Sequence, residues 1–291
     1  MTKASLIINA DDFGWGRKLS DTILDCHLHG IVTSTTLMVN MPAAEYAAKK
    51  AMEAPELSVG VHLNLTEGPP LSKKELVPDL LDESGNFPGY AKIRQRLWRG
   101  EKYFTQVIRE IKAQVERCLD LGIVPTHCDS HHGVHKFPVV RRAMVSVMRD
   151  KIITRARTTL SYHRIRRDVG ILQGAIPWLK RNLKRAPAIA SHAWGHYSLK
   201  HNGITIPDWK ATRSMGVPCG PAPKEQLLAC ILAVPEGCSE ILLHPGAHGS
   251  EDKPSEWHLR TWEEDTPLCL DQEVASFIQK SGVELVSFRY L

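Results

Sequence analysis

Short apolar runs recur along the chain and alternate with stretches of helical periodicity. The strand-like runs cover residues 5–10, 32–38, 57–65, 121–124, 152–156, 188–191, 240–243 and 283–287. The helical stretches cover residues 19–29, 43–54, 103–121, 137–148, 224–232 and 271–280. This order is typical of a parallel sheet whose strands are joined by crossover helices. With 291 residues, 43% of them hydrophobic, the chain has the size expected of one (β/α) barrel domain spanning residues 1–291.

Reactive side chains fall at the carboxyl ends of separate strand-like runs. They are Asp11 and Asp12, His62, His127 and Asp129, Arg155 and Arg157, and His244. In a (β/α) barrel these ends converge on one face, whereas structural polar residues would be scattered over both ends. The recurrence therefore predicts an active site at the carboxyl face of the sheet.

The densest of these clusters is residues 125–135, PTHCDSHHGVH. Because side chains alternate along a strand, His127, Asp129 and His131 are expected to share one face. A neutral imidazole binds divalent metals well, and a neighbouring carboxylate can bind the metal too or orient the ring. Any one of these histidines could belong to a solvated turn or a core, but the cluster as a whole favours a metal site.

If Asp12, His62 and His127 bind one divalent ion, open positions remain for water and substrate, as in catalytic sites. Asp11 would take a proton from the water, and Arg157 would hold Asp11 ionised. His244 would give the leaving amine its proton. A metal site with a base and an acid beside it is the arrangement expected for metal-assisted hydrolysis of an amide.

Two other functions use the same residues. His127, Asp129 and His244 reproduce the two-histidine, one-carboxylate triad of non-haem iron oxygenases, although oxygenases of that type are generally built on all-β scaffolds. The chain could also be a sugar- or metal-binding protein without catalysis. The presence of both Asp11 and His244 favours the hydrolase over this second alternative.

Composition limits the partners and the compartment. Lys and Arg number 37 against 32 Asp and Glu, a net charge of +5 that is mostly dispersed, so nucleic acid is not an expected partner. The seven cysteines form no CxxC pair, which favours reduced thiols in the cytoplasm. No apolar run approaches the length of a transmembrane helix. Residues 66–100 lack a clear period, and we interpret them as a loop insertion that covers the substrate. A second insertion is expected around residues 158–238.

Several motifs together resemble one family. Residues 9–14 (NADDFG), 31–40 (IVTSTTLMVN), 60–63 (GVHL) and 126–135 (THCDSHHGVH), with the later His244-Pro245-Gly246, look like the YdjC family of carbohydrate deacetylases. That family includes chitooligosaccharide deacetylases and, more distantly, hopanoid-associated deacetylases. One position departs from the pattern, because Gly133 stands where the family usually has another histidine.

The resemblance implies a deformed (β/α) barrel and removal of acetate from an N-acetylated sugar, such as an N-acetylglucosamine unit. It also implies one divalent metal ion, Mg, Zn, Mn or Co, held by the residues matching Asp12, His62 and His127, with Asp11 as the base. Asp129, His131 and Arg157 are then expected to bind or orient the substrate. Whether the sugar is free, phosphorylated or lipid-linked, and whether the chain forms a homodimer, is left open by the sequence.

Overall fold

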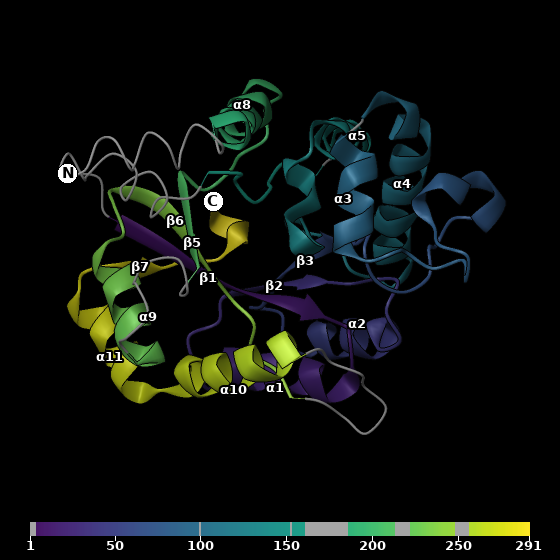
Figure 1. Ribbon diagram of the computed structural model, residues 1–291. Helices are drawn as coiled ribbons and strands as arrows, with labels where there is room; N and C mark the ends of the chain where they lie inside the picture. The colour runs from purple at the N-terminus through teal and green to yellow at the C-terminus, as the bar shows by residue number, and fades with distance from the viewer. Residues whose placement is uncertain (1–3, 99, 152, 161–185, 213–221, 248–255) are drawn as a thin grey trace.

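A parallel sheet forms the centre of the molecule in the computed structural model, which describes residues 4–98, 100–151, 153–160, 186–212, 222–247 and 256–291 (Figure 1). Its strands are β1 (Ala4–Phe13), β2 (Ser34–Leu37), β3 (Ser58–Leu63), β4 (Cys128–Ser130), β5 (Trp209–Thr212), β6 (Gly237–Leu243) and β7 (Glu284–Leu285). The hydrogen-bonded order is β4-β3-β2-β1-β6-β5, and β7 also pairs with β1. Every one of these pairs is parallel. All carboxyl ends therefore lie at one edge of the sheet.

The sheet curls into a deformed barrel. Beyond β4, isolated parallel bridges join Cys128 to Ala156 and Arg155 to Thr205. Because Thr205 lies four residues before Trp209, where β5 begins, these bridges continue the hydrogen bonding from one edge of the sheet toward the other. The expected (β/α) barrel is confirmed, with two short bridges in place of a full strand between β4 and β5.

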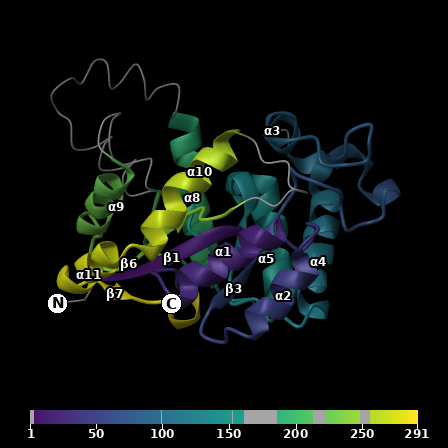
Figure 2. The same ribbon diagram turned by 90° about the horizontal axis from the view of Figure 1, so that it is seen from below.

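Helices cover the outside of the sheet (Figure 2). They are α1 (Arg17–Leu28), α2 (Ala44–Met52), α3 (Tyr90–Trp98), α4 (Phe104–Asp120), α5 (Pro138–Asp150), α8 (Ala186–His201), α9 (Pro223–Leu232), α10 (Glu256–Leu270) and α11 (Gln272–Lys280). In α4, Val107, Ile111 and Val115 recur at four-residue spacing and are all buried, which is the apolar stripe that packs a helix against a sheet. Over the part of the chain that the structure describes, no helix is both long and apolar enough to cross a bilayer.

Several local predictions were wrong. Residues 121–124 form a turn and not a buried strand: Gly122 has a φ of 82°, Val124 is 81% exposed, and β4 begins only at Cys128. Residues 188–191 belong to the helix α8. Of the predicted strand 152–156, residues 153–156 contribute isolated bridges only, and residue 152 lies outside the described residues. The sequence pattern also missed β5, α10 and, within residues 66–100, the helix α3.

Gly60 in β3 is required by a close approach from the neighbouring chain segment. A Cβ atom at this position would lie 2.6 Å from the imidazole of His127 and 2.7 Å from its carbonyl oxygen. The missing side chain lets the His127 ring lie inside the barrel. We expect Gly60→Ala to lower the free energy of unfolding by about 3 kcal/mol, because the carbonyl cannot move without disturbing the pairing of β3 with β4.

Urea denaturation measures this loss, with Gly203→Ala as the control. A Cβ atom at Gly203 would meet nothing within 4 Å, and the φ of 73° is its only source of strain, worth about 1 kcal/mol. Equal losses in the two variants would contradict the steric explanation.

Candidate active site

One arginine inside the barrel binds carboxylates from three strands. Arg157 is 2% exposed and follows the bridge at Ala156. Its guanidinium donates two hydrogen bonds to Asp11, of 2.6 and 2.8 Å, and one of 2.6 Å to Glu240. Its Nη1 atom also lies 2.7 Å from the carboxylate of Asp129. Since an unpaired buried carboxylate is strongly destabilising, Arg157 allows these three acids to be buried together.

Asp11 is held ionised by this arrangement. Its Oδ1 atom also accepts a hydrogen bond of 2.8 Å from the side chain of Asn9. Burial alone would raise the pKa of Asp11, but the charge of Arg157, assisted by those of His62 and His244, lowers the pKa to about 2. Asp11 is therefore a fixed carboxylate that is ready to accept a proton or a hydrogen bond.

Asp12 points to the same mouth of the barrel as Asp11, although consecutive strand residues normally point to opposite faces. The register of β1 against β2 shifts between Ala10 and Phe13, and Asp12 has a left-handed φ of 69°. This bulge turns the side chain of Asp12 toward His62, which both aspartates approach. Such a backbone costs about 1–2 kcal/mol for a non-glycine residue and is typical of functional sites.

The carboxylate of Asp12 is buried next to two imidazoles. Its Oδ1 atom lies 2.8 Å from Nδ1 of His131 and 3.4 Å from Nε2 of His62. These contacts lack the geometry of hydrogen bonds, so both oxygens of Asp12 and Nε2 of His62 are left without a hydrogen-bond partner. Three potential metal-ligand atoms therefore lie close together without forming hydrogen bonds to one another.

His62 is oriented from its other side. Its Nδ1–H donates a hydrogen bond of 2.5 Å to Asp129, and Thr36 donates one of 3.3 Å to the same carboxylate. The lone pair of the neutral ring is therefore on Nε2, the atom that faces Asp12, as in carboxylate–histidine–metal arrangements. Burial would lower the pKa of His62, but Asp129 and then Asp11 raise it to about 10. The carboxylates around His62 therefore stabilise a positive charge at this position.

The residues fit a divalent metal ion. Asp12, His62 and His131 each offer a donor atom, and these atoms all lie within 4.8 Å of one another. Ligand atoms about 2.1 Å from a shared ion are separated by roughly 3.0–3.4 Å, close to the observed contacts. The local charge agrees, because the four buried carboxylates of Asp11, Asp12, Asp129 and Glu240 outnumber the three buried cations, which are Arg157, Lys210 and protonated His62.

His127, which the sequence analysis expected to be the third ligand, does not join Asp12 and His62. Its ring stacks on Phe288 at 3.7 Å between centroids, and its Nδ1 atom lies 2.9 Å from the hydroxyl of Thr126. Strand alternation does place His127, Asp129 and His131 on one face, but each step of two residues moves about 6.6 Å along the strand. His127 therefore lies deep in the barrel, and His131 lies at the rim.

His244 lies where the sequence placed it, directly after β6. Its backbone N–H donates a hydrogen bond of 2.9 Å to Asp265, and its side chain is half-buried. Its charge contributes to the low pKa of Asp11, so the two side chains lie within electrostatic range of each other.

Two charged residues of the site were missed by the sequence analysis. Glu240 and Lys210 pair in register between β5 and β6, and both are buried. Burial lowers the pKa of Lys210 to about 8. A charged residue at the start of the apolar run 240–243 was a signal that could have identified Glu240.

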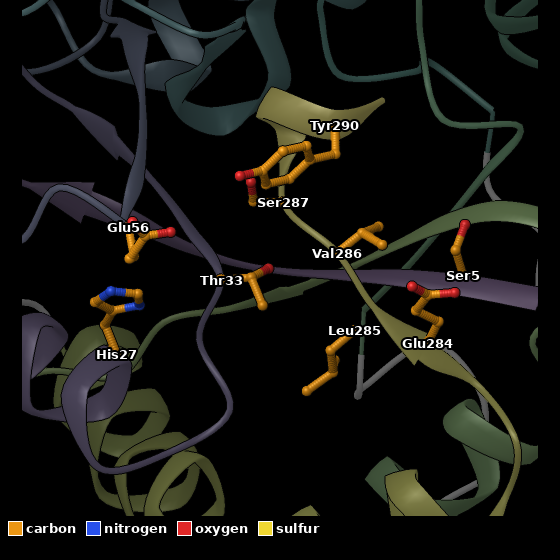
Figure 3. A pocket seen from close by; sticks show the side chains of 9 residues that line it. All are labelled: Ser5, His27, Thr33, Glu56, Glu284, Leu285, Val286, Ser287 and Tyr290. Atoms are coloured by element: carbon orange, nitrogen blue, oxygen red, sulfur yellow. The ribbon is translucent and has the colours of Figure 1, made fainter.

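A separate hollow of about 690 Å³ lies at the amino ends of the strands (Figure 3). Ser5 of β1, Thr33 before β2 and the segment 284–287 line it, together with His27, Glu56 and Tyr290. In (β/α) barrels the amino ends serve stability, and active sites form at the opposite face. We therefore assign the candidate active site to the Asp and His cluster at the carboxyl ends.

The fold and the cluster define a parallel α/β barrel with a potential metal site at the carboxyl ends of its strands. Residues 5–280 match the model of the YdjC-like proteins, and the chain belongs to that family. The expected family membership is thereby confirmed.

Several carbohydrate deacetylases are similar to this chain. The one from Geobacillus stearothermophilus is 47% identical over 46% of this chain and 51% of its own length. The one from Vibrio cholerae is 38% identical over 57% of this chain and 59% of its own length. The chain thus spans between 51% and 59% of the length of these two relatives. A carbohydrate deacetylase from Thermoanaerobacter pseudethanolicus is 27% identical over 98% of both chains.

A solved structure supports the same architecture. A protein from Enterococcus faecalis, provisionally described as a cellobiose-phosphate cleavage protein, superposes with a TM-score of 0.77. The match covers 99% of both chains at 25% identity.

The low pKa of Asp11 predicts a pH-dependent contribution to stability. Because the pKa falls from 3.8 to about 2 on folding, ionised Asp11 stabilises the fold above pH 4, and this contribution is lost as the pH falls through 2. The full contribution is about 2 kcal/mol. We expect the difference in unfolding free energy between the wild type and Asp11→Asn to shrink as the pH falls from 5 toward 2. Urea denaturation at several pH values tests this, and a constant difference would contradict it.

Proposed function

We propose that this protein is a metal-dependent hydrolase that removes the acetyl group from an N-acetylated sugar. The observation that carries the proposal is the group of unsatisfied donor atoms on Asp12, His62 and His131, next to the ionised carboxylate of Asp11. The relatives described as carbohydrate deacetylases support the choice of substrate. An N-acetylglucosamine unit of an oligosaccharide or glycoconjugate is the substrate class we favour.

In this mechanism Asp12, His62 and His131 hold a divalent ion, of which Mg, Zn, Mn and Co are candidates. When bound, such an ion polarises a carbonyl group and lowers the pKa of a water molecule. The protein supplies the remaining steps. Asp11 lies with Oδ2 3.9 Å from Nε2 of His62, a position from which its carboxylate can take the proton of the attacking water.

Arg157 keeps the base ionised, and His244 is the proton donor in this mechanism. The two hydrogen bonds from Arg157 fix both oxygens of Asp11 and keep the carboxylate ionised at neutral pH. An amine leaves an amide readily only when it is protonated, and His244 at the same mouth can donate that proton. Both roles were expected from the sequence and remain part of the proposal.

The non-haem iron alternative is less favoured. It requires Asp129 as a metal ligand beside His127 and His244, but Asp129 is engaged by His62, Thr36 and Arg157. The parallel barrel also differs from the all-β scaffolds of such oxygenases. A sugar-binding protein without catalysis is distinguished by an acetate-release screen over N-acetylated mono- and oligosaccharides and glycolipids with added divalent metals.

Asp11→Asn separates metal binding from catalysis. We expect the variant to bind the metal with unchanged stoichiometry and to release acetate about 10²–10⁴-fold more slowly, because an amide cannot accept the proton. Metal content by elemental analysis and acetate by a coupled assay measure the two effects. His62→Ala is the comparison and should lose both. Wild-type turnover in Asp11→Asn would remove Asp11 as the base.

His131→Ala and His127→Ala identify the third ligand. We expect His131→Ala to weaken metal binding by more than about 100-fold, since loss of a ligand exceeds the 10–100-fold effect of losing an outer partner. His127→Ala should keep metal affinity and lose stability only, because its ring packs on Phe288. Calorimetric titration of each variant with Zn²⁺ and Mn²⁺ measures the affinities. The reverse ranking would restore His127 as the ligand.

A further inference from the structure

A second group of possible metal ligands lies beside the first and shares one histidine with it. Glu67, His131 and His132 each offer one ligand atom, and these atoms all lie within 4.8 Å of one another. Two imidazoles and one carboxylate form a ligand set that suits a divalent cation such as zinc. The proposed mechanism uses His131 but neither Glu67 nor His132.

His131 has one ring nitrogen for each group. Its Nδ1 atom lies 2.8 Å from the carboxylate of Asp12, and its side chain is only 5% exposed. Its Nε2 atom is buried and has no hydrogen-bond partner among the described residues. Because a buried polar atom without a partner is costly, a ligand at Nε2 would stabilise the site. Nε2 is therefore the atom that His131 can offer to a second ion.

Glu67 brings a negative charge to this position. Its backbone N–H donates a hydrogen bond of 3.0 Å to the side chain of Asn64, and its carbonyl accepts one of 2.8 Å from the same side chain. A further hydrogen bond of 3.1 Å comes from Asn40. The backbone is thus fixed, whereas the half-buried carboxylate makes no hydrogen bond or ion pair within the described part of the chain. A cation beside it would supply the missing partner.

His132 is oriented as a ligand by its neighbours. Its ring lies 4.1 Å from that of His131, and its Nδ1 atom lies 3.0 Å from the hydroxyl of Thr66. That hydroxyl donates its own proton to Asn64, so it accepts a hydrogen bond from Nδ1–H of His132. The lone pair of the neutral ring is then on Nε2, the arrangement found in histidines that bind metals.

The backbone of His132 is strained in the same way as that of Asp12. His132 has a left-handed φ of 52°, and Asp12, with 69°, is the only other non-glycine residue with a positive φ in the described ranges. Each group of possible ligands therefore contains one residue in this costly conformation. Strain of this kind is typical of functional sites, where it places a side chain that an ordinary backbone would turn away.

We propose that Glu67, His131 and His132 hold a second divalent cation, so that the imidazole of His131 lies between two ions. The inference rests on the proposed function only for the first ion, which the same imidazole binds together with Asp12 and His62. A ring that binds through both nitrogens releases its N–H proton to water, so the second ion binds more weakly than the first. The second site fills when the metal is in excess.

Calorimetric titration of the metal-free protein with Zn²⁺ tests the second site. The wild type should bind two equivalents, one tightly and one more weakly. Glu67→Gln and His132→Ala should each weaken the second phase by more than about tenfold and leave the first phase unchanged. His131→Ala should weaken both phases, because its ring is shared. Glu56→Gln is the matched control, since Glu56 lies at the amino-end hollow.

Electron paramagnetic resonance with Mn²⁺ tests whether the two ions are neighbours. Two Mn²⁺ ions on one imidazole are close enough to broaden each other's signals. The spectrum of the wild type with two equivalents should therefore differ from twice the spectrum with one equivalent. Glu67→Gln with two equivalents should show one bound ion and one free ion.

The outcomes separate this inference from the proposed function. Two Zn²⁺ equivalents in the wild type and one in Glu67→Gln support the second site even if no acetate is released, in which case the proposed function alone fails. A wild type that releases acetate but binds a single equivalent overturns the second site and leaves the deacetylase intact. A weaker phase that persists unchanged in Glu67→Gln and His132→Ala is adventitious binding elsewhere and overturns the inference as well.

Discussion

The ion pairs of Arg157 are the interaction on which the interior of the barrel depends. A guanidinium group that is 2% exposed connects acids of β1, β4 and β6, which are far apart in the sequence. Removing the arginine would leave several buried carboxylates unpaired, a change that typically costs more than replacing the whole network by apolar residues. The arginine therefore fixes both the closure of the barrel and the ionisation of Asp11.

The same network also orients the potential metal site formed by Asp12, His62 and His131. Arg157 contacts Asp129, Asp129 accepts a hydrogen bond from Nδ1 of His62, and Nε2 of His62 consequently faces Asp12. Asp129 and His62 each bind one neighbour through one polar atom and the next neighbour through another. The chain of contacts ends at Asp12, whose oxygens have no hydrogen-bond partner, so the unsatisfied negative charge is concentrated at the mouth of the barrel. A cation is the group that such a site would stabilise most.

The sequence predicted the class of fold and most of the residues at this mouth, because the carboxyl ends of parallel strands must meet. It could not predict how far each side chain lies below the rim of the barrel. Strand alternation assigns His127 and His131 to the same face, and only the position where β4 begins, at Cys128, decides which of them reaches the rim. The bulge that turns Asp12 toward His62 leaves no sequence signal either. Lys210 was missed because β5 lies in a stretch without periodicity.

These depths divide the interior into layers with different roles. His127 and Phe288 form a stacked floor, for which Gly60 makes room by lacking a side chain. Above this floor lie Arg157 and its carboxylates, and His131 and Asp12 lie at the rim. Among the residues that the structure describes, this packed floor lies between the charged layer and the amino-end hollow, which leaves the carboxyl face as the open side of the charged layer. Burial away from water strengthens the electrostatic interactions within this charged layer, which is the condition that the proposed hydrolysis of a neutral amide by one fixed carboxylate requires.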